Sequence, residues 1–183
     1  AYVAPSATVC GDVTIGPRSR VMFGARLIAT GKPIAIGECV IVMENSVVRS
    51  TGDHAVCIGD HCLVGPHAHL VGCILEDECF VATGASVFHG ACLEKGCEVR
   101  VNGVVHLKSR LIAGAIVPIG WVAVGNPARI FPTEQHAEIW KIQEPLDFPA
   151  MAYGIRRDEA DMRTITEKVA ARLSSHRDDK IIS

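Results

Sequence analysis

A six-residue period in the aliphatic residues constrains the fold of this chain more than any other feature. Aliphatic residues recur at this spacing from Val3 to Val117, and a small residue stands two positions before most of them, as Ala85 does before Val87. A period of six fits neither an amphipathic helix nor a simple alternating strand. It fits a triangular coil in which each hexad is a short parallel strand plus a corner, and three hexads close one turn. The sequence therefore predicts an all-β solenoid with the aliphatics and their small partners inside.

The period is interrupted three times before the repeat ends. Three residues are added within positions 27–36, four are added within positions 48–58, and one is missing within positions 70–75. We expect the additions to be loops that leave the solenoid. The hexads stop near Gly125, so we expect a parallel β-helix domain over residues 1–128 and a C-terminal helical extension over residues 129–183.

The C-terminal extension is expected to contain two helices. Thr133 can cap a helix that runs to about Glu144, where Pro145 stops it. A second helix is expected from Asp158 to Leu173, because its apolar residues fall on one stripe. The connection from Leu146 to Arg157 is expected to be extended.

Composition excludes several classes of function. The 18 basic and 20 acidic residues give a net charge of −2 without a basic block, which argues against nucleic acid as a partner. The most apolar uncharged stretch, residues 111–125, is short and broken by Pro118, so no membrane span is expected. Residues 1–16 lack the basic start and apolar block of a secretion signal. We therefore expect a cytoplasmic protein.

The cysteines are expected to be packed thiols. Half of the eight occupy the small inward position of a hexad, where a thiol acts as a small hydrophobic group. No Cys-x-x-Cys pair exists, so neither thiolate-bound zinc nor a disulfide framework is favoured. The four inward cysteines are Cys62, Cys73, Cys79 and Cys97.

Three histidines are candidates for chemistry. His67 and His69 are two residues apart on outward positions of one predicted strand, and the stacking of coils brings His89 close to Gly72, with His106 one coil further on. Such a cluster could hold a metal ion or supply a general base. Imidazoles on a strand surface could equally make hydrogen bonds only, or fill a subunit interface.

The hexads resemble the left-handed parallel β-helix proteins of the bacterial transferase-repeat class, and residues 22–124 resemble the γ-class carbonic anhydrases more narrowly. The match lies in the irregular segments: Phe23–Leu27 followed by Pro33–Gly37 has the spacing of that family, and Val64–Cys73 has its five-residue step. The left-handed twist is implied by this resemblance, because parallel crossovers are otherwise right-handed.

The resemblance implies a homotrimer that binds zinc through three histidines from two subunits, but this chain has lost those histidines. Their positions carry Arg49, Pro66 and Val71, none of which can ligate zinc. The Arg-Gly-Asp of the family falls on residues 28–30, and its glutamine near the metal-bound water falls on Met43. We therefore predict no metal at the family positions and no carbonic anhydrase activity.

A shorter segment, Val9–Arg18, resembles the smaller β-helical subunit at the pointed end of dynactin, a structural protein without a metal site.

Three hypotheses follow. The first is a homotrimeric, non-catalytic binding or accessory protein that requires no cofactor. The second is an acyltransferase that uses coenzyme A and a histidine base, with His67, His69 or His89 as the candidate. The third is a metalloenzyme in which the same three histidines hold a displaced zinc site.

Overall fold

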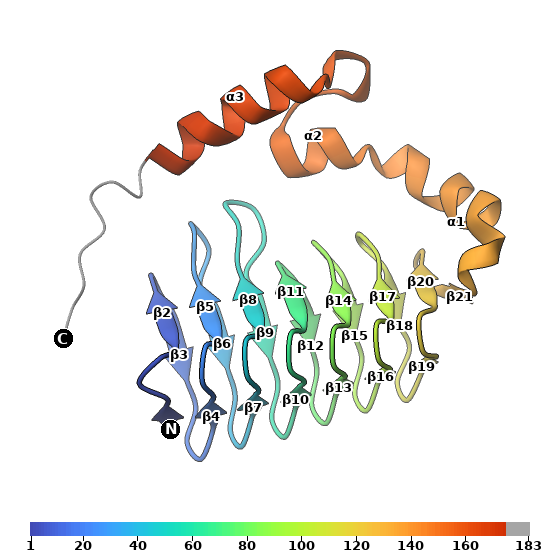
Figure 1. Cartoon of the computed structure of the whole chain (residues 1–183). Coiled ribbons are helices and arrows are strands. Elements are labelled where there is room, and N and C mark those ends of the chain that lie inside the picture. The colour runs from blue at the N-terminus through green and yellow to red at the C-terminus, as the bar shows by residue number, and fades with distance from the viewer. Residues whose placement is uncertain (175–183) are drawn as a thin grey trace. The chain divides into compact units, whose positions relative to one another are not determined.

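The structure, a computed structural model, describes residues 1–174 and shows a parallel β-helix followed by helices (Figure 1). The predicted fold class, a left-handed parallel β-helix with C-terminal α-helices, is confirmed. The chain divides into two compact units, the first formed by residues 1–140 and the second beginning at Lys141. The first unit is the β-helix with the segment that closes it, and the second unit is helical.

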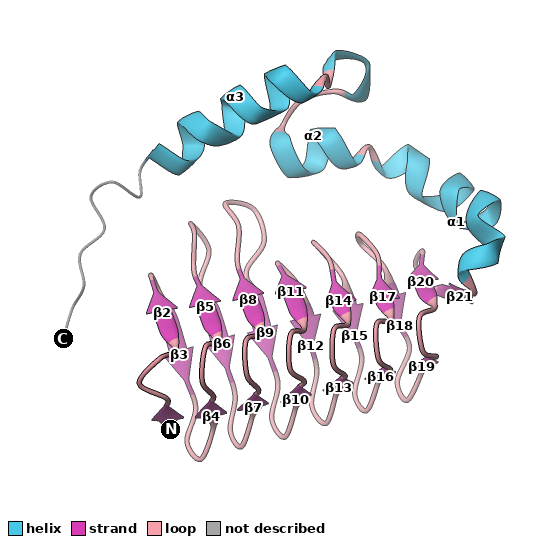
Figure 2. Ribbon diagram, viewed as in Figure 1, coloured by secondary structure: helices cyan, strands magenta, loops and turns pink. Residues whose placement is uncertain are grey.

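Three sheets form the sides of the β-helix, and the chain visits sheets A, B and C in turn (Figure 2). Sheet A contains β1 (Tyr2–Val3), β4 (Arg20–Val21), β7 (Ile41–Val42), β10 (Leu63–Val64), β13 (Phe80–Val81), β16 (Glu98–Val99) and β19 (Ile116–Val117). Sheet B contains β2 (Thr8–Cys10), β5 (Arg26–Ile28), β8 (Val47–Arg49), β11 (His69–Val71), β14 (Ser86–Val87), β17 (Val104–Val105), β20 (Val122–Val124) and β21 (Arg129–Phe131). Sheet C contains β3 (Val13–Ile15), β6 (Ile34–Ile36), β9 (Val56–Ile58), β12 (Ile74–Leu75), β15 (Cys92–Leu93) and β18 (Arg110–Leu111).

The turns between sheets form three edges, which we call the A–B, B–C and C–A corners. In the third coil these corners are residues 43–46, 50–55 and 59–62. All neighbouring strands pair in parallel except β20 and β21, which are antiparallel. Equivalent residues of successive coils therefore lie above one another at the spacing of hydrogen-bonded strands.

The core is the column of aliphatics that the six-residue period predicts. Leu27, Val48, Leu70 and Val87 are successive partners in sheet B, and each is fully buried. Ala85, at the small inward position, is also fully buried. Each large aliphatic buried in this way contributes about 1.5–3 kcal/mol relative to an exposed one. The predicted inward register is confirmed.

All three interruptions of the period fall at the B–C corner. The two additions form the loops between β5 and β6 and between β8 and β9, which extend beyond the neighbouring corners (Figure 1). The missing residue shortens the link between β11 and β12 to residues 72–73. Because the strands on either side keep their register, the irregularity alters one edge of the β-helix and leaves the core unchanged.

The glycines that follow inward aliphatics are required by close approach of the next coil. A Cβ atom on Gly37 would lie 2.4 Å from the Asp60 carboxylate, and one on Gly59 would lie 2.5 Å from the Asp77 carboxylate. Neither glycine has a positive φ, so the turn itself does not demand glycine there. The left-handed positions of several corners are filled by other residues, among them Asn45 and His67.

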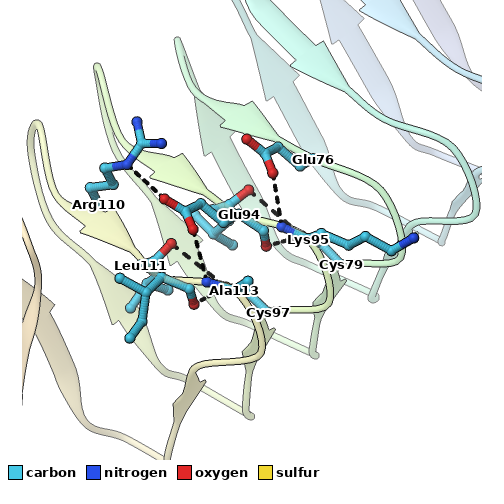
Figure 3. Close-up of polar contacts among 10 residues, drawn as sticks. Glu76, Cys79, Glu94, Lys95, Cys97, Arg110, Leu111 and Ala113 are labelled. Atoms are coloured by element: carbon cyan, nitrogen blue, oxygen red, sulfur yellow. Dashed lines mark hydrogen bonds and ion pairs between the residues drawn. The ribbon is translucent and has the colours of Figure 1, made fainter.

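Carboxylates and thiols join successive coils along the C–A corner (Figure 3). The Glu76 carboxylate accepts the Lys95 backbone N–H at 3.0 Å, and the Glu94 carboxylate accepts that of Ala113 at 3.0 Å. Glu94 also binds the Arg110 guanidinium at 2.8 Å. These bonds satisfy backbone donors that a parallel ladder leaves open at a turn.

Three of the four inward cysteines line the same corner from inside. The thiols of Cys62, Cys79 and Cys97 donate to backbone carbonyls of the following coil at 3.1–3.3 Å. Burial raises the pKa of the Cys97 thiol to about 11, so this thiol stays protonated at neutral pH. Cys73 is fully buried as well, and all eight cysteines are free in the described chain. The prediction of packed thiols is confirmed for these four.

The end of the β-helix differs in detail from the prediction. β21 folds back on β20 and buries Phe131. A 3-10 helix, Thr133–Gln135, then leads into α1 (His136–Gln143), so Thr133 lies inside the first turn and does not cap it. A second 3-10 helix, Glu144–Leu146, contains Pro145, because proline is compatible with the first turn of a helix.

The helical unit corrects one expectation and confirms another. Residues 146–157, expected to be extended, contain α2 (Phe148–Tyr153). Asp147 caps this helix by accepting the Ala150 N–H at 3.3 Å, and Pro149 lies in the first turn, where proline is compatible with a helix. After a 3-10 helix at Arg157–Glu159, α3 (Met162–Leu173) lies inside the range expected for the second helix. Residues 175–183 of the predicted extension lie outside the described residues.

Candidate functional site on sheet B

The outer face of sheet B carries two of the three positions to which the resemblance assigns zinc ligands. Arg49 ends β8 and Val71 ends β11, and the two are direct partners in the register of these strands. Pro66 lies at the A–B corner that precedes β11, at the opposite end of the strand. One chain therefore brings Arg49 and Val71 together and holds Pro66 apart, an arrangement suited to a site shared by two copies.

The other replaced positions belong to the same region. Ile28 ends β5 and pairs with Arg49, so Arg49 lies between two apolar side chains along its row. Thr30 hydrogen-bonds to Ser50 through its hydroxyl at 2.8 Å and through its backbone N–H at 3.0 Å. The residues in place of the Arg-Gly-Asp thus contribute an apolar contact and a bond between two loops.

Arg49 dominates the electrostatics of this face. Its side chain is half-buried, and it forms no ion pair or side-chain hydrogen bond with any of residues 1–174. Partial burial and the Arg49 charge together lower the pKa of His69, which lies on β11 beside this row. His69 is therefore neutral at pH 7. A metal cation would meet repulsion from Arg49 and no negative ligand from these residues.

The three candidate histidines do not form one cluster within a chain. His67 lies at the A–B corner with a left-handed φ of 56°. His69 lies on β11, and His89 lies at the B–C corner after β14. His67 and His89 are thus at opposite edges of sheet B. Across residues 1–174, no group of three or more His, Cys, Asp or Glu side chains could hold a metal ion.

A different pair of histidines does meet, at the B–C corner. The rings of His54 and His89 are 6.1 Å apart and edge-to-face. His54 lies in the four-residue insertion, which is fixed where the Thr51 N–H donates to the His54 carbonyl at 2.9 Å. The ring lies beside Gly90, one coil above Gly72. The position of the insertion was visible in the sequence, but its path was not, and so His54 was missed.

His106 occupies the next coil along the same side. Its ring lies 6.0 Å from that of Phe88, and its Nδ1 atom is buried without a hydrogen-bond partner in the described chain. Burial lowers the pKa of His106 to about 4, so the ring is neutral at pH 7. The predicted stacking, with His89 near Gly72 and His106 further along, is confirmed, since the Gly90 N–H donates to the Gly72 carbonyl at 2.7 Å.

Comparison with known proteins supports the family to which this fold belongs. No family model matches the chain. It is 36% identical over 135 residues to Gamma carbonic anhydrase 1, mitochondrial, from Arabidopsis thaliana, covering 70% of this chain and 47% of the relative. It is 28% identical over 126 residues to Dynactin subunit 6 from Xenopus tropicalis, covering 66% and 56%. The chain thus spans about half the length of the curated relatives it matches.

Among solved structures, a hexapeptide transferase family protein from Anaplasma phagocytophilum is similar over 94% of this chain and 90% of its own. The TM-score is 0.45 and the sequence identity is 24%. The six-residue repeat and the triangular coils place the chain among the hexapeptide-repeat, left-handed β-helix proteins. Within that class it is a γ-carbonic-anhydrase-like protein.

Proposed function

We propose that this chain forms a homotrimer that acts as a non-catalytic binding or accessory protein, without carbonic anhydrase activity. The register of Arg49 with Val71 carries the proposal. Two positions that the resemblance assigns to zinc ligands are direct partners on sheet B, and they carry a half-buried guanidinium and a buried aliphatic side chain. A guanidinium stays protonated and offers only donors, so it cannot give a lone pair to a metal.

The trimer is supported by the character of the β-helix surface. Two relatives named as γ carbonic anhydrases are 36% and 34% identical to this chain over 70% of its length, and the resemblance implies three copies around an axis. Exposed apolar side chains also lie on the β-helix, including Phe23 at 51% and Ile119 at 70% exposure. Contact between copies would remove such groups from water.

A carbon dioxide hydration assay together with elemental analysis tests the loss of the zinc site. The protein is purified without an affinity tag and incubated with excess zinc before both measurements. We expect no acceleration above buffer and less than stoichiometric zinc. Stoichiometric zinc with measurable hydration activity would overturn the proposal.

A metalloenzyme with a displaced histidine site is a second candidate, favoured by the contact between His54 and His89. Two imidazoles from one chain would need further ligands from water or from another copy to reach the usual coordination. His89→Ala and His67→Ala distinguish this candidate in the same elemental analysis. Stoichiometric metal that disappears with His89→Ala would establish a displaced site.

The acyltransferase hypothesis and the cytoplasmic location stay predictions. A rise in melting temperature with increasing coenzyme A would favour an acyltransferase, because a ligand that binds only the folded state stabilises it.

No helix in residues 1–174 is long and apolar enough to span a membrane. Cell fractionation would test the location, and three of the curated relatives are named as mitochondrial.

A further inference from the structure

Glu44 and Arg49 lie in the same coil, at the two ends of β8. Glu44 is at the A–B corner before the strand, and Arg49 is its last residue. Both are half-buried, and neither side chain forms an ion pair or hydrogen bond within residues 1–174. The rest of the A–B corner, with the left-handed Asn45, and most of β8 lie between them, and the two side chains do not pair with each other. A half-buried charge without a partner is costly, so each of these groups calls for an opposite charge from outside the chain.

The same spacing of five joins chemically matched residues in the coils on either side. In the coil before, the exposed Phe23 at the A–B corner is five residues from Ile28 at the end of β5. In the coil after, Pro66 at the A–B corner is five residues from Val71 at the end of β11. The corner and the far end of sheet B are therefore both apolar in these two coils, and oppositely charged in the coil between them.

A ring of copies around an axis parallel to the β-helix would use this match. Such a rotation keeps every coil at the same height, so an A–B corner that packs against the sheet B face of the next copy would meet residues of the same coil. We propose that the A–B corner of each copy packs against sheet B of the next, so that Glu44 forms an ion pair with Arg49 of its neighbour, flanked by a contact of Phe23 with Ile28. Val71, on the other side of Arg49, is already buried within its own chain. The inference rests on the homotrimer proposed above and assigns residues to its interface.

The surroundings of Arg49 suit an ion pair between subunits. Ile28 and Val71 lie on either side of Arg49 in its row, and the neutral ring of His69 adds no positive charge nearby. An ion pair covered by apolar groups is screened less by salt than an exposed pair. A residue that cannot bind zinc thus gains a structural role at the position where the resemblance places a metal ligand.

Charge reversal tests the pair in the full chain by sedimentation equilibrium. Arg49→Glu and Glu44→Arg each bring like charges together, and each is expected to raise the dissociation constant of the trimer by about a hundredfold or more. The double variant restores opposite charges with the positions exchanged. It is expected to recover most of the affinity, since a direct pair couples the two substitutions.

Arg20→Glu provides the matched control, because Arg20 is exposed on sheet A, lies over the ring of Tyr2 and forms no ion pair with any of residues 1–174. It makes the same change in net charge and should leave the trimer intact. A wild-type protein that sediments as a 19.6 kDa monomer would refute the homotrimer itself. A wild-type trimer that both reversals leave unchanged would refute the ion pair alone.

Two further outcomes decide between contact and mere proximity. If each reversal dissociates the trimer and the double variant does not recover it, the residues do not face each other and the inference fails. If a reversal variant lacks the circular dichroism spectrum of the wild type, the neutral Arg49→Met and Glu44→Gln replace it. Each neutral variant should then weaken the trimer by a smaller factor, and the double neutral variant should be no weaker than either.

Discussion

The C–A corner and the outer face of sheet B use their polar side chains in opposite ways. At the C–A corner, Glu76 and Glu94 accept backbone N–H groups of the next coil, and Glu94 also pairs with Arg110. On sheet B, Arg49 has no hydrogen-bonded or ionic side-chain partner among residues 1–174, and His106 Nδ1 is buried without an acceptor or donor. Polar groups of the first region stabilise the stacking of coils. Those of the second region have no partner among the described residues.

The difference has an energetic meaning. A satisfied hydrogen bond contributes about 0.5–1.5 kcal/mol to folding, whereas a buried polar group without a partner costs about 1–3 kcal/mol. In a single chain, the polar groups of the C–A corner therefore stabilise the fold, and those on sheet B lower its stability. Such a burden on an isolated chain is expected where a surface serves binding, since association can relieve it.

Overpacking the core should destabilise the β-helix as a whole, and with it both regions, and gives the largest expected effect. Ala85 is fully buried at a small inward position, directly before β14 of sheet B. Ala85→Leu should lower the free energy of unfolding by about 1–3 kcal/mol, because the extra methylenes strain the adjacent coils. Chemical denaturation followed by circular dichroism measures the loss.

Ser86→Leu is the matched control for this substitution. Ser86 is the next residue and lies on the outer side of β14, half-buried. The same side chain should be tolerated there, with a change of about 0.5 kcal/mol or less. Equal destabilisation by the two variants would show that the alternation of inward and outward positions is wrong.

Removing one charge from each region should change the stability by different amounts. Glu94→Ala deprives the Ala113 N–H and the Arg110 guanidinium of their acceptor. We expect a loss of about 1 kcal/mol, which lowers the melting temperature by about 2–4 °C in a chain of this size. Arg26→Met, on sheet B, removes an exposed charge without a side-chain partner in the described residues. It should change the stability by less than about 0.5 kcal/mol.

Differential scanning calorimetry of the two variants and the wild type checks this contrast. Glu94→Gln refines it, because the amide oxygen can still accept the Ala113 N–H while the charge opposite Arg110 is lost. Its melting temperature should lie between those of the wild type and Glu94→Ala. If Arg26→Met destabilises as much as Glu94→Ala, the two regions do not differ in the way proposed.

The fold could be predicted because its determinants are local and repeated. The hexad states which residues are inside in every coil, and inward positions such as Leu70 and Cys73 are buried as expected. The three interruptions were located correctly because they shift the period. The twist required the resemblance, since a six-residue period is compatible with either hand. α2 was missed because it is short and has no periodic pattern, and its signals are only the cap at Asp147, the proline in its first turn and the left-handed Gly154 at its end.

The site was predictable only where coil stacking determines it. Register places Arg49 beside Val71 and brings the coil of His89 over that of Gly72, and both follow from counting residues. The contact of His54 with His89 depends on the path of an insertion outside the repeat, which no period describes. His67 was expected on the strand of His69. The structure places it at a left-handed turn before that strand, where the two side chains belong to different surfaces.

The smallest expected effect is a dependence of stability on pH at sheet B. Burial lowers the pKa of His106 to about 4 in the folded chain, against an ordinary value of 6.5. Between these values the unfolded chain binds a proton that the folded chain does not, so acid favours unfolding. The stability due to neutral His106 is therefore complete above pH 6.5 and is lost as the pH falls towards 4.

His106→Phe removes the titrating group and keeps an aromatic ring beside Phe88. Because the ring of His106 is partly exposed, solvent reduces the effect, and we expect a difference of about 1 kcal/mol or less. Urea unfolding at pH 7.5 and pH 4.5 compares the wild type with the variant, and the carboxylates of the C–A corner cancel because both proteins contain them. The variant should lose less stability in acid than the wild type. Equal losses would mean that His106 is protonated in the folded chain as readily as in the unfolded one, and that this face bears no such burden.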